Sequence, residues 1–441
     1  MSHEKNVSDS QGTKNLRSTS TGGLIEDFKA SKSNALTRRD ISTNTESDKD
    51  KPQIITTPSL TLSFRHQKAT ENPLPGKEMV DKVPLAGKGA ALLGMDTTLL
   101  IVCSNRPQYL KKSLEYIVKY HPKSSIPIVI SEDGNNPEVA RVIDDARKLF
   151  EDLAQGEGKA AAPFSHLHHA SPSNKFYENG YFKLADHFKA ALDDVFLKDS
   201  QAKRVIIVEE DLQISPDFFE FFAGTMKLLD EDPNLLAVSA WNDNGFKRFV
   251  KDNKQLYRSD FFPGLGWMLT KSMWQELSVK WPQAYWDDWL REPKQRKGRH
   301  IIRPEVSRTF HFGAHGVSNA QYSGYLTSVY LNEEFVPFTS MDLSYLTQDR
   351  WDASYAHDAK MAKLVTMQNY QSMVETLGLK EVRIVYEGFD EPKGPHPTFS
   401  QLALWSGIMD NVKAGVPRTA YHGIVSFWRG DVKVHFTLPD F

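Results

Sequence analysis

The stretch RVIIVEEDLQISPDFFEFF, residues 204–222, places four apolar residues directly before three carboxylates. An uninterrupted apolar run of this length, followed by turn residues, is typical of a strand buried on both faces of a parallel sheet. In such sheets ligands bind at the carboxyl ends of the strands. The carboxylates Glu209, Glu210 and Asp211 repel one another, so their clustering at that end indicates a site for a cation.

A simpler interpretation treats the same carboxylates as a solvated turn between the strand and a helix. Ser215 as the N-cap and Pro216 at the first helical position predict where that helix begins. The position of the carboxylates after a buried strand favours the ligand site. Period-two alternation predicts that Glu209 and Asp211 share one side and that Glu210 points to the other.

Two earlier segments also predict strands that end in polar residues. TTLLIVCSNRPQYLKKSLEYIVKYHP contains a strand at 99–103, a turn that includes Arg106, and an amphipathic helix at 109–120. IPIVISEDGNNPEV contains a second strand, which ends near Asp133. Short strands alternating with helices predict an α/β domain with a mainly parallel sheet, so these polar residues should meet at one edge.

The rest of the chain differs in composition from this region. Residues 1–92 are rich in Ser, Thr, Asn, Lys and Asp and predict a disordered tail or stem. The Trp-, Gly- and Pro-rich stretch at 261–318 is suited to a cleft wall. A helix at 356–377 and strands within 381–388, 423–429 and 432–438 predict a smaller C-terminal α+β domain, residues 346–441.

Charge and composition exclude several classes of partner and site. With 54 basic and 56 acidic residues the net charge is −2, so we expect no nucleic-acid partner. No run approaches the roughly 20 apolar residues of a membrane span, and no signal peptide is visible. The phosphate-binding loops of nucleotide-binding proteins are also absent from the sequence. Clustered carboxylates without such loops suit a nucleotide-sugar transferase, in which Mg²⁺ or Mn²⁺ holds the diphosphate.

Six segments in collinear order carry a family resemblance. VEEDLQISPDFFEFF, VSAWNDNG, YRSDFFPGLGWML, KWPQAYWDDWLR, IRPEVSRTFHFGAHGVS and GVPRTAYHGIV resemble the N-acetylglucosaminyltransferase I family from Thr97 to the C-terminus. The resemblance implies a GT-A type nucleotide-sugar-binding domain at 93–345, including a loop that closes over the donor. It also implies an inverting, Mn²⁺-dependent transfer of GlcNAc from UDP-GlcNAc, with Mg²⁺ as a possible substitute. The linkage that the resemblance implies is β-1,2 to the α-1,3-linked mannose of Man5GlcNAc2 on glycoproteins, the step that initiates hybrid and complex N-glycans.

The resemblance also implies a role for each site residue. Asp211 matches the protein ligand of Mn²⁺, and Asp287, the first Asp of WDDW, matches the catalytic base. Glu209 matches a position near the donor sugar, and Glu210 one near the ribose. The remaining matches to donor-binding positions are Arg106, Asp133, His187 and Ser318.

Three departures from the family pattern keep alternatives open. Glu210 stands where Asp is usual, which resembles the protein O-linked-mannose β-1,2-N-acetylglucosaminyltransferases and gives a second candidate acceptor. Cys103 is the only cysteine, so packing must replace the disulfides of animal members. The family's type II Golgi membrane anchor is not visible here, and we expect the natural N-terminus to lie outside this chain. A non-catalytic UDP-sugar-binding or glycan-binding protein on the same fold is the third candidate.

Overall fold

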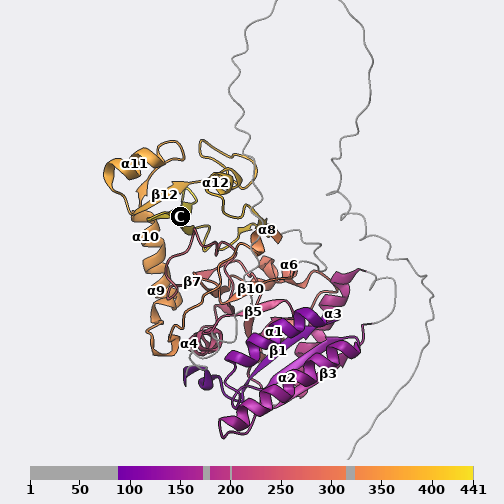
Figure 1. The fold of residues 1–441 in the computed structure, drawn as a ribbon. Helices are drawn as coiled ribbons and strands as arrows, with labels where there is room; N and C mark the ends of the chain where they lie inside the picture. The colour runs from indigo at the N-terminus through magenta and orange to yellow at the C-terminus, as the bar shows by residue number, and fades with distance from the viewer. Residues whose placement is uncertain (1–87, 172–178, 199–200, 314–322, 441) are drawn as a thin grey trace, which may run out of the picture. The chain divides into compact units, whose positions relative to one another are not determined.

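The computed structural model describes residues 88–171, 179–198, 201–313 and 323–440. All of them belong to one unit, Pro73–Phe441, and the expected tail at 1–92 lies almost wholly outside them. Of that tail, only residues 88–92 are described, and they belong to a short 3-10 helix, Lys88–Leu93, in which Ala90 and Leu93 are buried. Figure 1 shows the arrangement of the helices and strands.

A large sheet of eight strands forms the centre of the fold, in the order β3-β2-β1-β4-β8-β6-β9-β7. Strands β3, β2, β1 and β4 are parallel neighbours, as are β6 and β9, whereas β8 and β7 run antiparallel to the strands beside them. The predicted α/β fold with a mainly parallel sheet is therefore confirmed. The strands are β1 (Thr97–Cys103), β2 (Ile128–Asp133), β3 (Phe164–His169), β4 (Arg204–Glu209), β6 (Leu235–Ser239), β7 (Leu256–Ser259), β8 (Trp267–Thr270) and β9 (His300–Pro304).

Strand β4 is buried on both faces, as its sequence predicts. Ile206 and Val208 join the hydrophobic cluster on one side of the sheet, and Val205 and Ile207 join the cluster on the other. The strand ends at Glu209, and a turn leads to the short strand β5 (Leu212–Ile214). The ladder therefore stops before the last two carboxylates, whose directions are set by the turn instead.

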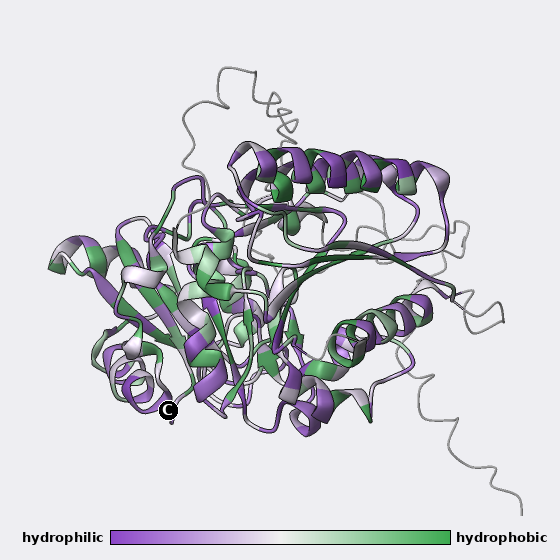
Figure 2. Cartoon of the chain, turned by 90° about the horizontal axis from the view of Figure 1, so that it is seen from below, coloured by the Kyte–Doolittle hydropathy of each residue, from purple (hydrophilic) through white to green (hydrophobic). Residues whose placement is uncertain are grey.

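Helices cover both faces of the large sheet. On one face lie α1 (Pro107–Tyr120), α2 (Pro137–Gly156) and α4 (Phe218–Glu231). On the other lie α3 (Gly180–Asp193), α5 (Lys271–Ser278) and α6 (Trp286–Arg291). In Figure 2 the strands are mostly green and the helices carry purple residues on their outer turns, so apolar surface is buried between the layers.

Helix α4 begins two residues later than the sequence predicts. Its first residue is Phe218, preceded by Asp217, and Ser215 Oγ donates a hydrogen bond to Asp217 Oδ1 at 2.6 Å. The predicted N-cap at Ser215 is thus wrong. Asp217 is fully buried and forms an ion pair with Arg308 at 3.1 Å, a distant contact that fixes the turn.

The C-terminal part contains a second sheet, in the order β11-β12-β16-β15. Its strands are β11 (Lys363–Leu364), β12 (Glu381–Val385), β15 (Val425–Arg429) and β16 (Val432–Thr437). The predicted helix at 356–377 is wrong, because β11 interrupts it to pair with β12. The helices after residue 292 are α7 (Pro293–Arg296), α8 (Ser323–Leu326), α9 (Gln348–Trp351), α10 (His357–Met361), α11 (Tyr370–Leu377) and α12 (Phe399–Ser406).

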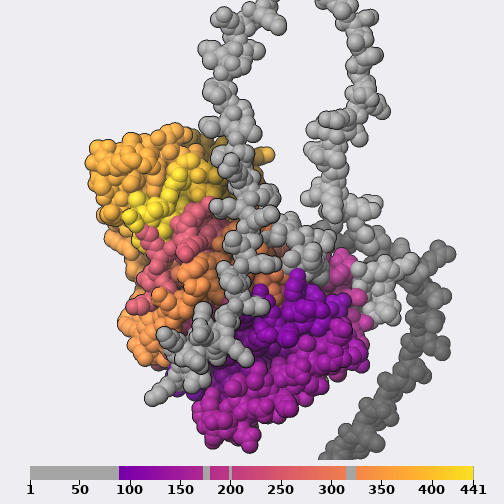
Figure 3. Space-filling view, viewed as in Figure 1, coloured from indigo at the N-terminus to yellow at the C-terminus, as the bar shows by residue number. Residues whose placement is uncertain are grey.

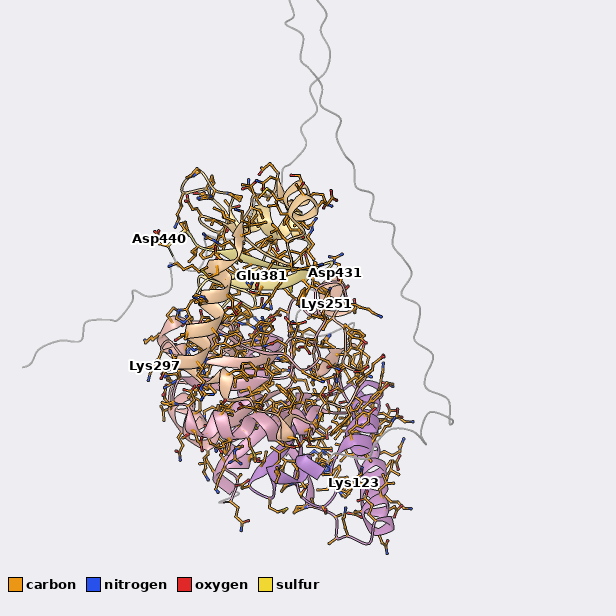
Figure 4. All side chains as sticks on the ribbon, turned by 90° about the vertical axis from the view of Figure 1, so that its left-hand side faces the viewer. Lys123, Lys251, Lys297, Glu381, Asp431 and Asp440 are labelled. Carbon is orange, nitrogen blue, oxygen red and sulfur yellow. The ribbon has the colours of Figure 1, made fainter. Side chains whose placement is uncertain are left out.

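This second sheet shares a core with the preceding part of the chain. Trp241, Phe246 and Phe249 pack in one cluster with Ile384 and Phe427. In the space-filling view of Figure 3, the orange and yellow C-terminal residues lie directly against earlier segments of the chain. An ion pair between Lys251 and Asp431, both labelled in Figure 4, also connects the two parts. The division between 93–345 and 346–441 stays a prediction.

Among the described residues, no helix combines the length and the apolar composition that crossing a membrane requires.

Candidate active site

The three carboxylates of the triplet follow β4 at the carboxyl end of the parallel strands. Arg106, in the turn after β1, contacts two of them: its Nε lies 2.5 Å from Glu210 Oε1, and its Nη1 lies 3.0 Å from Asp211 Oδ2. Both carboxylates are buried. The prediction that Glu210 points away from Asp211 is therefore wrong, since one guanidinium bridges the two.

Ser104 connects this arrangement to the end of β2. Its backbone N–H donates to Glu210 Oε2 at 2.7 Å, and its hydroxyl donates to the carbonyl oxygen of Asp133 at 3.0 Å. Both carboxylate oxygens of Glu210 are thus engaged by the turn after β1. The first role of Glu210 is to hold Arg106 and this turn, while its predicted contact with a ribose stays a prediction.

A segment about 100 residues further along the chain closes the other side of Asp211. Strand β10 (Thr309–His311) pairs antiparallel with β5, which places His311 Nε2 at 3.5 Å from Asp211 Oδ2. The next turn brings Gly313 so close that a Cβ atom there would lie 2.5 Å from the same oxygen. Only glycine fits at residue 313, because any side chain would displace the carboxylate.

The pKa values of the two carboxyl groups Glu209 and Asp211 are shifted in opposite directions. Burial, followed by the charge of Asp211, raises the pKa of Glu209 to about 7, and the carboxylate of Asp287 adds to the effect. Burial also acts to raise the pKa of Asp211, but the contacts with His311 and Arg106 outweigh it and lower that pKa. Burial acts to lower the pKa of His311, yet Asp211 and Glu209 overcome it and raise that pKa. The site therefore favours additional positive charge.

Asp133 and His187 lie beside this centre, toward α3. The hydroxyl of Ser171 donates to Asp133 Oδ1 at 2.9 Å. His187 is buried, hydrogen-bonds through Nε2 with Ser131 Oγ at 2.8 Å, and stacks on His169. Burial lowers the pKa of His187 to about 4, against the attraction of Asp133. His187 is therefore a neutral imidazole at physiological pH.

Asp287 lies in the first turn of α6. Arg291, one turn later, places Nη1 at 2.9 Å from Asp287 Oδ2 and 2.7 Å from Asp288 Oδ1. The side chain of Asp287 remains 42% exposed, so it can reach a ligand, whereas Asp288 is also held by Lys413 at 2.9 Å. The helix itself is anchored by Trp286, which is buried in the cluster on the α3 side of the sheet.

The structure brings most of the predicted residues together but not all can be placed. Arg106 contacts both Glu210 and Asp211. The charge of Asp211 acts on the pKa of Glu209, and the charge of Asp133 acts on the pKa of His187. Ser318 lies outside the described residues.

Sequence reasoning missed four residues that shape the site: Ser104, Arg291, His311 and Gly313. Arg291 carried a readable signal, because it follows Asp287 by four residues on a predicted helix. The other three act through long-range contacts that no local pattern reveals.

The residues present fit a hard divalent cation. Asp211 and Glu209 offer carboxylate oxygens, the ligand type that Mg²⁺ and Mn²⁺ prefer. The raised pKa of Glu209 shows that this carboxyl is charged only at a cost when no cation is added. In addition, the buried His311 Nδ1 has no hydrogen-bond partner among the described residues.

Comparisons with known proteins identify the family of this chain. A family model described as "GNT-I family" matches residues 69–441. The alpha-1,3-mannosyl-glycoprotein 2-beta-N-acetylglucosaminyltransferase of Arabidopsis thaliana is 38% identical over 338 residues, which are 75% of this chain and 70% of that protein.

The solved structures that this chain matches are more distant. The mannosyltransferase PcManGT from Pyrobaculum calidifontis, in complex with GDP-Man and Mn²⁺, has 13% identity and a TM-score of 0.33, covering 52% of this chain and 63% of that one. S. aureus TarS 1–349 in complex with UDP has 13% identity and a TM-score of 0.34, covering 49% and 59%. This chain thus spans about three fifths of each solved protein. By its family-model match and its Arabidopsis relative, the chain belongs to the GNT-I family.

Proposed function

We propose that this protein transfers GlcNAc from UDP-GlcNAc, with inversion, in β-1,2 linkage to the α-1,3-linked mannose of Man5GlcNAc2 N-glycans. The observation that carries the proposal is the pairing of Arg106 with both Glu210 and Asp211 at the carboxyl end of β4. It supports a site for a divalent cation and a diphosphate, and Asp287 adds an accessible carboxylate on α6. Membership of the GNT-I family supports the same reaction.

Asp211 is the proposed ligand of Mn²⁺, with Mg²⁺ as a substitute. When bound, the metal neutralises the diphosphate and stabilises it as a leaving group. Arg106 adds a second positive charge beside the same carboxylate and is suited to a phosphate oxygen of the donor. Glu210 orients Arg106 rather than competing for the cation, since both of its oxygens are already engaged.

Asp287 is the proposed catalytic base. As the acceptor hydroxyl oxygen bonds to the anomeric carbon, the bond from that carbon to the diphosphate oxygen breaks and the hydroxyl proton passes to Asp287. Arg291 pairs with this carboxylate and fixes its direction, which makes Arg291 a positioning residue. The cluster of Trp286, Trp281 and Trp267 holds the helix that carries the base.

The other predicted residues are proposed to bind the donor. Asp133 and His187 lie on the side of α3, where a neutral imidazole and a carboxylate can contact the uridine. Glu209, whose pKa is raised by burial and by the charge of Asp211, is proposed to contact the donor sugar. Glu210 and Ser318 keep their proposed places near the ribose and on the loop that closes over the donor.

Three functions are compared: transfer to an N-glycan, transfer to O-linked mannose, and sugar binding without catalysis. The Arabidopsis relative is named for an α-1,3-mannosyl glycoprotein, which favours the N-glycan over O-linked mannose. A non-catalytic sugar-binding role is disfavoured because Asp211, Asp287 and Arg106 are all present and positioned. With the function we propose residence in the Golgi lumen with type II membrane attachment, on the basis of the family alone.

Product analysis with Man5GlcNAc2, UDP-GlcNAc and Mn²⁺ tests the proposal. We expect one added β-1,2-linked GlcNAc, loss of product with EDTA, and much less product from an O-mannosyl peptide. Asp211→Ala should lose both turnover and metal-dependent donor binding, whereas Asp431→Ala, at an exposed carboxylate in the turn between β15 and β16, should retain both. Preference for the peptide would shift the function to O-mannose, and donor binding without any turnover would make the protein a binder.

A further inference from the structure

A second group of potential metal ligands lies on the outer edge of the large sheet. Glu132 is on β2, and His166 and His168 are on the edge strand β3 (Figure 1), where Glu132 pairs directly with His168. Glu132 Oε2 lies 2.8 Å from His166 Nε2 and 3.4 Å from His168 Nδ1. One ligand atom from each residue falls within 4.8 Å of the other two.

The charge of Glu132 is the reason to expect a cation there. Its side chain is completely buried, and among the described residues its ion-pair partners are the two imidazoles alone. Arg147 is the nearby guanidinium whose charge reaches His166, but it pairs with Asp144 at 3.3 Å and lies over the ring of Phe164. A buried carboxylate is costly unless it is paired or coordinates a metal.

We propose that Glu132, His166 and His168 bind a borderline transition-metal ion of the Zn²⁺ class. Two imidazoles and one carboxylate are a known three-ligand set for zinc, and imidazole favours zinc over Mg²⁺ or Mn²⁺. Zinc–ligand bonds of about 2.0–2.1 Å in a tetrahedron separate the ligand atoms by roughly 3.3 Å. The pair at 3.4 Å already has this spacing, and the pair at 2.8 Å must open by about half an ångström.

The surroundings orient the ligands and leave one position accessible. Glu132 Oε1 accepts a hydrogen bond from the backbone N–H of Asn136 at 2.6 Å, so its other oxygen is directed at the imidazoles. The His166 side chain is 10% exposed and that of His168 is 48% exposed. The fourth ligand is therefore a water from the solvent side.

In a similar cluster elsewhere, positively charged side chains already accompany the possible ligands. Asp260, His300 and His422 also bring three ligand atoms within 4.8 Å. However, Asp260 pairs with Arg296 at 3.0 Å, and His300 Nδ1 lies 3.1 Å from Arg258 Nη2. Two guanidiniums repel a metal ion, so this second cluster serves as an internal control.

Metal at the Glu132 cluster would join β3 to β2 through side chains as well as backbone. Asp133, the neighbour of Glu132, points to the opposite face of the sheet, toward His187. The cluster is thus separate from the proposed donor pocket but fixes the strand ends that form it. Its expected effect is on the stability of the sheet edge, and the inference does not rest on the proposed function.

Zinc titration of the full chain, stripped of metal and kept in excess Mg²⁺, tests this inference. We expect one saturable Zn²⁺ equivalent by calorimetry and an increase in Tm that grows with Zn²⁺ concentration. Co²⁺ in place of Zn²⁺ should give visible absorption bands of a four-coordinate site. His168→Ala should weaken zinc binding at least tenfold, while its metal-free Tm stays close to that of the unchanged protein because the side chain is about half exposed.

Two further variants separate this cluster from other ligands. His422→Ala should keep the zinc equivalent, and Asp211→Asn should keep it as well. Loss of binding in either of these variants, or equal binding in His168→Ala and the unchanged protein, would overturn the inference. Absence of any saturable binding would overturn it too. None of these outcomes depends on GlcNAc transfer, so failure here and failure of the proposed function are distinguishable.

Discussion

Arg106 and Asp211, which lie 105 positions apart in the sequence, form a partly buried ion pair in which Nη1 and Oδ2 are 3.0 Å apart. The same guanidinium is held by Glu210, so its position is fixed before any ligand binds. A cation is thus built into the site next to the proposed metal ligand. The diphosphate of a donor would meet two positive charges there.

Arg106→Gln should weaken UDP binding by about 10- to 100-fold, because charge-assisted hydrogen bonds contribute roughly 1.5–3 kcal/mol. Mn²⁺ binding in the absence of donor should not weaken, since a repelling charge has been removed from Asp211. Calorimetry with UDP and with Mn²⁺ separates the two effects. Arg106→Lys is the matched control. Its UDP affinity should lie between those of the unchanged protein and Arg106→Gln, because lysine keeps the charge but loses the fork geometry. Unchanged UDP affinity in the Gln variant would contradict the assignment.

Asp287→Asn should retain UDP-GlcNAc affinity and lose turnover by about 10²- to 10⁴-fold, the range that general-base catalysis supplies. The amide keeps the shape of the side chain but cannot accept the acceptor proton. Donor titration and single-turnover kinetics give the two readings. The matched control is Asp288→Asn, whose carboxylate is already bound by Arg291 and Lys413 and should matter less. Normal turnover in Asp287→Asn would refute the role of the base.

Glu209→Gln should stabilise the metal-free protein at alkaline pH. The folded-state pKa of Glu209 is raised from 4.5 to about 7, first by burial and then by Asp211. Between these values the folded state holds a proton that the unfolded state has lost, so stability falls as pH rises through this window. At pH 8 the variant should gain on the order of 1–3 kcal/mol in free energy of unfolding, and at pH 4.5 almost nothing.

Urea unfolding in EDTA at the two pH values measures this difference. Saturating Mn²⁺ should reduce the stability gain of the variant at pH 8, because a bound cation stabilises the ionised carboxylate of Glu209 in the unchanged protein. An equal effect of the substitution at both pH values would show that the pKa of Glu209 is not raised in the folded protein.

His121→Phe should make the protein less sensitive to acid. His121 is fully buried between the rings of Phe150 and Phe219, and burial, reinforced by Lys123, lowers its pKa to about 3. Below pH 6.5 the imidazole of His121 binds a proton in the unfolded chain but stays neutral in the folded state. The free energy of unfolding therefore decreases as pH falls toward 3. At pH 5 this one group accounts for about 2 kcal/mol relative to pH 7.

Thermal unfolding of the two proteins from pH 7 to pH 5 checks this prediction, and the curves should diverge in that interval. His422→Phe, at an exposed histidine, is the control and should follow the unchanged protein. Parallel curves for His121→Phe would mean that the buried imidazole is protonated in the folded state.

The sequence by itself determined the features that depend on neighbouring residues. The run at 205–208 must be buried on both faces, and the carboxylates after it must lie at the strand end, because strand burial and chain direction are local properties. The α/β class followed from the same alternation, and the resemblance carried by six motifs supplied the expected roles. Arg291 was within reach of sequence reasoning through its helical spacing from Asp287.

Only the tertiary structure decided which distant residues meet. Arg106 bridges Glu210 and Asp211, β10 brings His311 and Gly313 against Asp211, and β11 divides a segment that reads locally as one helix. These contacts close loops of many residues, and their gain is realised only when the whole core has packed. The pairing of β2 with β3, which places Glu132 against two histidines, is of the same kind. Local patterns therefore located the site, and long-range packing completed it.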